Sequence, residues 1–272
     1  MSSSSLIPSS QKPLSTPASG FVITPRLIEK PWGGSWLSTQ YKSQVSKLGE
    51  AWLLSTLDEG ESELDGRPLS EAIGGKLPFV VKIIDSSEPL SVQVHPNDEW
   101  ARQLENSKGK TECWLILASE PDAGVYLGFK ENAKPRAFET ALKMGQPVDS
   151  YLEFVKVKRG DFLVVPAGTI HAIGPGVTLL EVQQASGITY RLWDWNRAGR
   201  ELHVEKGLRV SSYARKHEVR RDILNEQGIL LKHADFTCWI NESEGEGWFI
   251  DLTSYEVYRG SAAIKKPYVF VR

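Results

Sequence analysis

Short runs of strand-forming residues, broken repeatedly by turn residues, constrain the fold of this chain more than any other feature. From Phe21 onward, runs rich in Val, Ile, Leu and aromatic residues alternate with Gly, Pro, Asp and Asn. This texture is typical of strands joined by turns. The clearest predicted strands cover residues 79–84, 90–95, 112–118, 151–157, 162–165 and 178–184, and weaker ones 229–231, 236–240 and 248–252. Many short strands with few helices favour a closed or sandwiched antiparallel sheet.

Helical patterns are sparse and short. They cover about residues 70–73, 97–106, 136–143 and 201–210. Asn97 is followed by Asp98 and Glu99, which predicts a capped helix start with acidic residues in the first turn.

Charge and hydropathy exclude several classes of protein. The 272 residues carry 32 Lys plus Arg against 34 Asp plus Glu, a formal net charge of -2, so no broad positive field is available for nucleic acid. No run approaches the roughly 20 apolar residues of a spanning helix, and the start lacks the features of a secretory signal. We therefore expect a cytoplasmic protein without nucleic-acid or membrane partners. Its cysteines, Cys113 and Cys238, are isolated and are predicted to be reduced thiols.

The segment 89–96 carries the first polar row. Strict alternation places apolar residues on one face of a strand and polar residues on the other, namely Leu90, Val92 and Val94 against Ser91, Gln93 and His95. Taken alone, this pattern also suits an ordinary surface strand whose polar row meets water.

Two further segments bring charged and titratable groups. Alternation puts Lys110 and Glu112 on the same side of a strand, where a solvated ion pair is an equally good interpretation. Residues 160–171 combine a Gly-Asp turn, a β run and a Pro-x-Gly turn that ends at His171. This arrangement resembles the second motif of the cupin barrel, in which the histidine points inward and binds a metal.

The resemblance to cupins groups four scattered residues into one donor set. They are Gln93, His95, Glu112 and His171. Two imidazoles, one carboxylate and one amide oxygen suit a borderline divalent ion, zinc above all. In a plain cupin the first motif carries a His-x-His pair, with the Glu only a few residues further on. This chain departs from that pattern in two ways: Gln93 replaces the first His, and a predicted helix separates His95 from Glu112.

These departures match one family. The chain resembles the cupin-type mannose-6-phosphate isomerases, in the short bacterial form that lacks a large helical insertion. The matching pieces run in family order from about Leu27 to Leu208, and they are residues 30–34, 49–55, 91–96, 109–114, 165–171, 181–186, 190–191 and 200–206.

The resemblance implies a fold, a cofactor and an activity. The fold would be an all-β cupin, or jelly-roll, barrel with a few short helices and a smaller second β unit. One zinc ion per chain would be held by Gln93, His95, Glu112 and His171. The enzyme would interconvert mannose 6-phosphate and fructose 6-phosphate through an enediol, with catalytic residues Arg191, Lys110 and Glu181 and substrate-binding residues Ser91, Trp32, Arg191 and Lys110.

These roles suit the chemistry of an aldose-ketose isomerisation. An enediolate needs a preorganised positive centre beside its oxygens, and a divalent ion whose only charged ligand is Glu112 keeps net positive charge. A guanidinium is a good bidentate match for phosphate, which suits Arg191. Two roles are considered for Glu181, proton transfer and the positioning of a substrate hydroxyl. Structural ion pairing is the alternative for Lys110, Glu181 and Arg191.

One feature of the family is missing from this chain, and two other functions fit the same residues. Many family members have an Asp after the serine that aligns with Ser186, whereas this chain has Gly187, so a proton path through that Asp cannot operate here. One alternative function is an iron-dependent cupin oxygenase that uses His95, Glu112 and His171. Another is a sugar-binding cupin without catalysis.

The chain is predicted to have three parts. Residues 1–20 are rich in Ser and Pro and form a loose tail, residues 21–215 form the metal-binding cupin domain, and residues 216–272 form a smaller cupin-like unit without metal. We expect this unit to cover a sheet edge of the main barrel. The sequence leaves the oligomeric state open.

Overall fold

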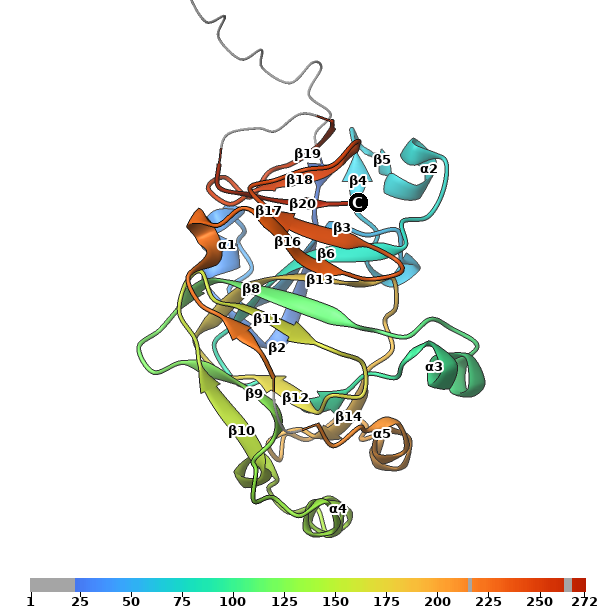
Figure 1. Ribbon diagram of the computed structural model, residues 1–272, viewed down its shortest axis with the longest axis vertical. Coiled ribbons are helices and arrows are strands. Elements are labelled where there is room, and N and C mark those ends of the chain that lie inside the picture. The colour runs from blue at the N-terminus through green and yellow to red at the C-terminus, as the bar shows by residue number, and fades with distance from the viewer. Residues whose placement is uncertain (1–22, 215–216, 262–265) are drawn as a thin grey trace, which may run out of the picture.

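The structure is a computed structural model that describes residues 23–214, 217–261 and 266–272. The predicted tail of residues 1–20 lies outside the described residues. Three large antiparallel sheets are stacked one upon another (Figure 1), and helices α4 and α5 lie at the far end of the stack.

The middle layer is a seven-stranded sheet with the order β15-β11-β8-β13-β6-β2-β3. Its strands are β2 (Arg26–Gly34), β3 (Leu48–Leu54), β6 (Phe79–Ser86), β8 (Glu112–Ser119), β11 (Phe162–Val165), β13 (Val177–Gln184) and β15 (Val219–Arg220). Because side chains alternate along each strand, this sheet buries side chains on both of its faces.

A five-stranded sheet, with the order β10-β9-β12-β7-β14, faces the seven-stranded sheet. Its strands are β7 (Val92–Val94), β9 (Gly124–Phe129), β10 (Leu152–Lys156), β12 (His171–Ile173) and β14 (Tyr190–Trp193). An apolar cluster that includes Trp114, Leu127 and Leu163 fills the space between the two sheets. The two sheets therefore form a sandwich, and the site described below lies inside it.

The C-terminal sheet packs on the opposite face of the seven-stranded sheet. It has the order β16-β17-β20-β18-β19, with strands β16 (Gly228–Lys232), β17 (Thr237–Ile240), β18 (Gly247–Asp251), β19 (Val257–Gly260) and β20 (Tyr268–Val271). Leu115, Leu180 and Ile240 belong to one continuous core between these layers. A small sheet of β1 (Ile23–Thr24), β4 (Glu63–Leu64) and β5 (Arg67–Pro68) completes the β structure.

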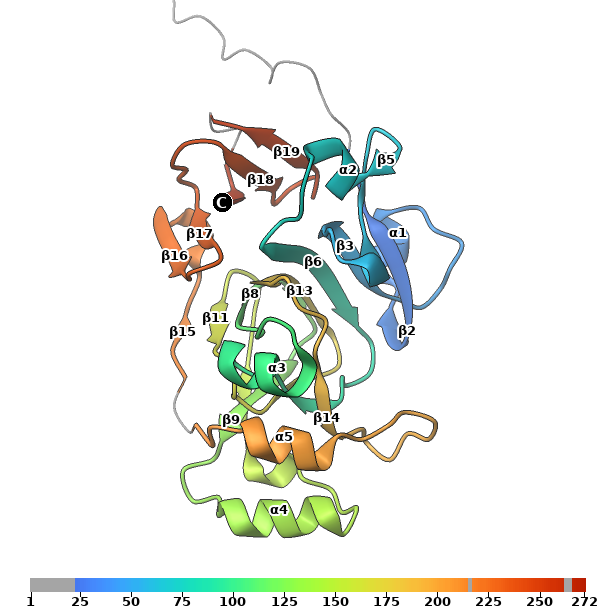
Figure 2. The same ribbon diagram turned by 90° about the vertical axis from the view of Figure 1, so that its right-hand side faces the viewer.

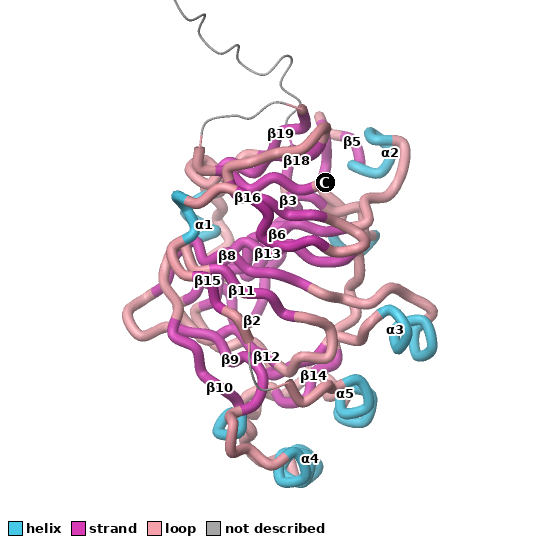
Figure 3. The backbone as a smooth tube through the Cα atoms, viewed as in Figure 1, coloured by secondary structure: helices cyan, strands magenta, loops and turns pink. Residues whose placement is uncertain are grey.

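The helices are short and lie outside the sandwich (Figures 2 and 3). They are α1 (Trp36–Gln40), α2 (Leu69–Ile73), α3 (Asp98–Glu105), α4 (Pro135–Lys143) and α5 (Val204–Val210), with 3-10 turns η1 (Asp58–Gly60), η2 (Asp149–Tyr151) and η3 (Ile223–Asn225). Asn97 caps α3 as predicted, because its side chain accepts a hydrogen bond of 2.9 Å from the Trp100 amide. Among the described residues, no helix is long and apolar enough to cross a membrane.

The predicted all-β fold class with few helices is confirmed, with local differences. Strand β7 begins at Val92 rather than Leu90. The Leu90 amide donates instead to the Ile173 carbonyl, so Leu90 packs between the sheets, away from Val92 and Val94. The division into domains at residues 215 and 216 stays a prediction.

Candidate metal centre

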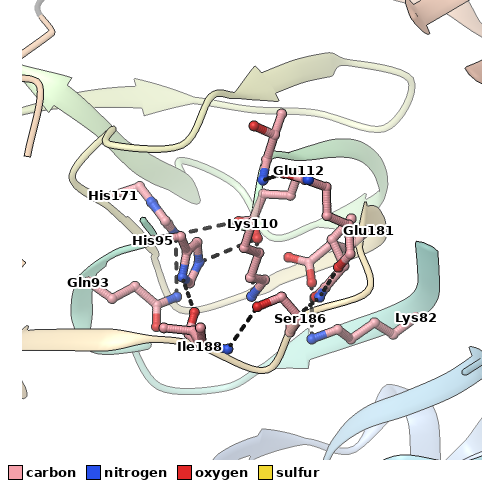
Figure 4. Close-up of polar contacts among 12 residues, drawn as sticks. Lys82, Gln93, His95, Lys110, Glu112, His171, Glu181, Ser186 and Ile188 are labelled. Carbon is pink, nitrogen blue, oxygen red and sulfur yellow. Dashed lines mark hydrogen bonds and ion pairs between the residues drawn. The ribbon is translucent and has the colours of Figure 1, made fainter. Parts of the chain in front are cut away.

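Three side chains converge inside the sandwich from two facing sheets (Figure 4). His95 follows β7, His171 begins β12, and Glu112 begins β8. The Nε2 atoms of His95 and His171 each lie 3.4 Å from a different carboxylate oxygen of Glu112. One ligand atom from each residue lies within 4.8 Å of the other two. All three residues are buried, so they form a cluster of metal-binding residue types in the interior of the sandwich.

The outer nitrogen of each imidazole is held by a backbone carbonyl. His95 Nδ1 lies 2.9 Å from the Ile188 oxygen, and His171 Nδ1 lies 2.9 Å from the Thr169 oxygen. A carbonyl only accepts hydrogen bonds, so the proton of each neutral ring belongs on Nδ1 and the Nε2 lone pair faces the centre. A metal-binding histidine commonly has its other ring N–H held by a carbonyl in this way.

Burial keeps both histidines neutral. It lowers the pKa of His171 to about 4, and burial together with the Lys110 charge lowers the pKa of His95 well below its ordinary value. Burial and the nearby Glu181 raise the pKa of Glu112 to about 7. A cation among these three groups would relieve the cost of burying the Glu112 carboxylate.

These donors fit the predicted zinc ion. Ligand atoms about 2.0–2.1 Å from a tetrahedral zinc ion are about 3.4 Å from one another, and each histidine Nε2 lies at this distance from one of the two Glu112 oxygens. His95 Nε2 is buried and forms no hydrogen bond to any described residue. A buried nitrogen without a partner is costly, and a metal ion would satisfy it.

Gln93, the fourth predicted ligand, faces the same centre. It is the register partner of His171 on the neighbouring strand, and its Nε2 lies 3.4 Å from His171 Nε2. A half-turn about the last side-chain bond of Gln93 would exchange its amide nitrogen and oxygen and present the oxygen to the centre. The role of Gln93 as a ligand stays a prediction.

A second buried row of side chains crosses the seven-stranded sheet beside this centre. Register pairing aligns Trp52, Lys82, Glu181 and Trp114 on the neighbouring strands β3, β6, β13 and β8. Lys82 Nζ lies 3.1 Å from Glu181 Oε1 and 4.7 Å from the centre of the Trp52 ring. The Trp114 indole donates a hydrogen bond of 2.9 Å to Glu181 Oε2.

This row keeps its charges in spite of burial. Burial alone would raise the pKa of Glu181, but Lys82, Lys110 and the Trp114 hydrogen bond lower it to about 2. For Lys82, burial would lower the pKa, and Glu181 and Glu50 more than offset this effect. Lys82 and Glu181 are therefore an ion pair at neutral pH.

A cavity of about 300 Å³ opens beside the metal centre. Five cationic side chains and two carboxylates line it, namely Lys30, Lys82, Lys110, Arg191, Arg200, Glu50 and Glu181. Lys110 connects the cavity to the centre, because its Nζ lies 3.2 Å from Glu112 Oε2. This pair is buried rather than solvated, which corrects the surface interpretation considered from the sequence.

The structure brings the other predicted site residues to the same cavity. Trp32, Ser91, Gln93 and Arg191 all line it, and Arg191 is the register partner of Gln93. Lys30, Glu50, Lys82 and Arg200 also line it, although sequence reasoning did not select them. The sequence does mark Lys82 and Glu50, since each is a charged residue inside an otherwise apolar segment and is therefore expected to be buried with a partner.

Gly187 also lines the cavity, and a carboxylate lies close to it. A Cβ atom built on Gly187 would lie 2.2 Å from Glu59 Oε1. Asp194, the nearest acid that follows in the sequence, instead forms ion pairs with Arg197 at 2.7 Å and with Arg200 at 3.2 Å.

Comparisons with known proteins agree on one family. A family model described as the catalytic domain of type I phosphomannose isomerase matches residues 19–123. The chain is 37% identical to mannose-6-phosphate isomerase ManA of Bacillus subtilis, over 74% of this chain and 72% of that protein. It is 32% identical to the mannose-6-phosphate isomerase of Streptococcus mutans, over 75% of this chain and 71% of that protein.

Solved structures share the fold over nearly the whole chain. The crystal structure of the Bacillus subtilis mannose 6-phosphate isomerase has a TM-score of 0.72 and 25% identity, and the alignment covers 92% of each chain. A mannose 6-phosphate isomerase bound with zinc and yttrium has a TM-score of 0.64 at 16% identity, covering 92% of this chain and 93% of that one.

Proposed function

The chain belongs to the mannose-6-phosphate isomerase family, and on this premise we propose that it interconverts mannose 6-phosphate and fructose 6-phosphate with one bound zinc ion. The observation that carries the proposal is the convergence of His95, Glu112 and His171, with one ligand atom from each within 4.8 Å of the other two, beside a cation-lined cavity. Zinc as the metal is also supported by the relative of the same fold that is bound with zinc and yttrium.

His95, Glu112 and His171 would hold the metal, with the Gln93 amide oxygen as the fourth protein ligand. A bound zinc ion would supply positive charge beside the two oxygens of the enediolate. Because both imidazoles are neutral, Glu112 would be the only charged ligand, and the centre would keep a net positive charge.

The charge of the cavity suits a phosphosugar. Five cationic side chains against two carboxylates give a positive environment for a phosphate dianion. We assign the phosphate to Arg191, since a guanidinium can bind two phosphate oxygens at once, with Arg200 as a second cation on the same wall. Ser91 and Trp32 would contact the sugar.

The isomerisation moves a proton from carbon 2 to carbon 1 of the sugar. Glu181 has a pKa of about 2, and such a carboxylate is a weak base at neutral pH. Both of its oxygens are also engaged, by Lys82 and by the Trp114 indole, and we assign Glu181 to hydroxyl positioning rather than proton transfer. Lys110, between Glu112 and the cavity, would donate a hydrogen bond to the sugar oxygen on which negative charge develops.

A turnover assay of the purified chain on mannose 6-phosphate tests the proposal. We expect fructose 6-phosphate to form without oxygen, and activity to disappear on chelation and return with zinc. Oxygen consumption with bound iron would instead indicate a cupin oxygenase. Intact zinc with background turnover would indicate a protein that only binds sugar. We place this activity in the cytoplasm.

A further inference from the structure

The turn between β16 and β17 reaches from the C-terminal sheet to the segment that carries Lys110. Asp235 lies in this turn. One of its carboxylate oxygens accepts a hydrogen bond of 2.7 Å from Gln184 Nε2, and the other lies 2.7 Å from Lys108 Nζ. Asp235 is therefore in direct contact with Lys108, at one end of the segment 108–111, and with Gln184, which bonds to the backbone at the other end.

Gln184 connects Asp235 to the backbone beside Lys110 through hydrogen bonds on both ends of its side-chain amide. It is buried, and its Nε2 also donates to Asp98 Oδ1 at 3.1 Å. Two carboxylates can only accept, so they fix the amide nitrogen on their side and the amide oxygen on the other. That oxygen accepts a hydrogen bond of 2.9 Å from the amide of Thr111, the residue between Lys110 and Glu112.

The rest of the segment is held tightly. The Gly109 amide donates to Asp98 Oδ1 at 2.8 Å, and the Ser186 hydroxyl donates to the Lys108 carbonyl at 2.9 Å. A side chain at Gly109 would bring its Cβ within 2.6 Å of the backbone of Asp98. Because the backbone of residues 108–111 is packed this closely, a change in the orientation of Gln184 would move this segment.

We propose that Asp235 is a positioning residue that fixes the Lys110 ammonium at the metal centre by orienting Gln184. The proposal rests on the proposed function, in which Lys110 contacts the substrate. The C-terminal sheet then does more than cover the main sandwich, because one of its turns sets the geometry of a catalytic group. Removing the Asp235 carboxylate would leave one buried N–H of Gln184 without a partner, and of the two carboxylates only Asp98 would then hold the amide nitrogen in place.

The test compares Asp235→Ala and Asp235→Asn with wild type in the full chain loaded with zinc. Asn keeps an oxygen that can accept from Gln184 and loses the charge that pairs with Lys108. We expect kcat on mannose 6-phosphate to fall about tenfold in Asp235→Ala and to stay within about threefold of wild type in Asp235→Asn, with zinc content unchanged. Asp122→Ala is the matched control, since Asp122 forms an exposed ion pair with Lys156 at 2.6 Å.

A double-mutant cycle separates positioning from simple destabilisation. In the Lys110→Ala background, Asp235→Ala should leave the residual kcat unchanged, because its effect passes through Lys110. A further tenfold loss in that background would overturn the proposal. So would full kcat in the single variant Asp235→Ala.

Hydrogen exchange of the backbone amides of residues 108–111 tests the contact without turnover. We expect faster exchange of Thr111 in Asp235→Ala and not in Asp122→Ala. Faster exchange in a protein whose wild type shows no isomerase activity would refute the proposed function while the orienting contact stands. Unchanged exchange in an active enzyme would refute the positioning role alone.

Discussion

Lys82 and Glu181 are register partners on neighbouring strands, and their charged groups lie 3.1 Å apart in the interior of the protein. Both side chains are less than a tenth exposed, at 8% and 3%. A buried ion pair is weak evidence of stabilisation, but it makes each partner necessary to the other. Here the pair also forms one wall of the cavity beside the metal centre.

Removing Lys82 alone is expected to destabilise the protein. Lys82→Met keeps most of the side-chain volume and leaves the Glu181 charge buried without its nearest counter-charge. Breaking such a pair costs about 3–5 kcal/mol. The free energy of unfolding in urea measures this effect. The double variant Lys82→Met/Glu181→Gln should recover part of the loss, and equal stability of wild type and the single variant would contradict the importance of the pair.

The same pair predicts how stability depends on pH. The pKa of Glu181 is about 2 in the folded protein, below the value of about 4.3 for an unperturbed glutamate. Its stabilising contribution is therefore complete above about pH 4.3 and is lost as pH falls through about 2. We expect the free energy of unfolding of wild type to fall by about 3 kcal/mol more over this window than that of Lys82→Met/Glu181→Gln. If the free energies of unfolding of wild type and of the double variant fell in parallel with pH, the low pKa of Glu181 would be contradicted.

Arg191→Ala is expected to weaken binding of the phosphate-bearing substrate. The Michaelis constant for mannose 6-phosphate should rise about tenfold or more, with a smaller change in kcat, because the phosphate is distant from the reacting carbons. Steady-state kinetics at several substrate concentrations measure both constants. An unchanged Michaelis constant with lost turnover would assign Arg191 to catalysis instead.

Each metal ligand is expected to be needed for zinc as well as for activity. Gln93→Ala, His95→Ala, His171→Ala and Glu112→Gln should all lower zinc content and turnover together, since ligand loss weakens the site. Glu226→Gln is the matched control for Glu112→Gln, because Glu226 pairs with Arg220 away from the site. Zinc content is measured by atomic emission on the purified variants. Full activity in a zinc-free variant would refute the assignment.

The sequence predicted those features that depend on local pattern. Alternation identified the shared face of Lys110 and Glu112, and the Pro-x-Gly turn located His171 at the start of a strand. These signals are local because side-chain direction in a strand repeats every second residue.

Other features could not be predicted because they depend on tertiary contacts. Strand β3 is buried along its whole length, so it shows no alternation, and its Leu, Ala and Glu are not strand-forming residues. The Lys82 and Glu181 pair depends on the register between two strands nearly a hundred residues apart in the sequence. The contact of Asp235 with Gln184 likewise joins two sheets.

The most direct test of the central claim is anomalous diffraction at the zinc edge from crystals of the purified full-length chain. We expect one strong peak per chain, about 2.0–2.1 Å from His95 Nε2, His171 Nε2 and an oxygen of Glu112. A crystal grown with zinc that has no peak among these three residues, or a peak only elsewhere, would contradict the account.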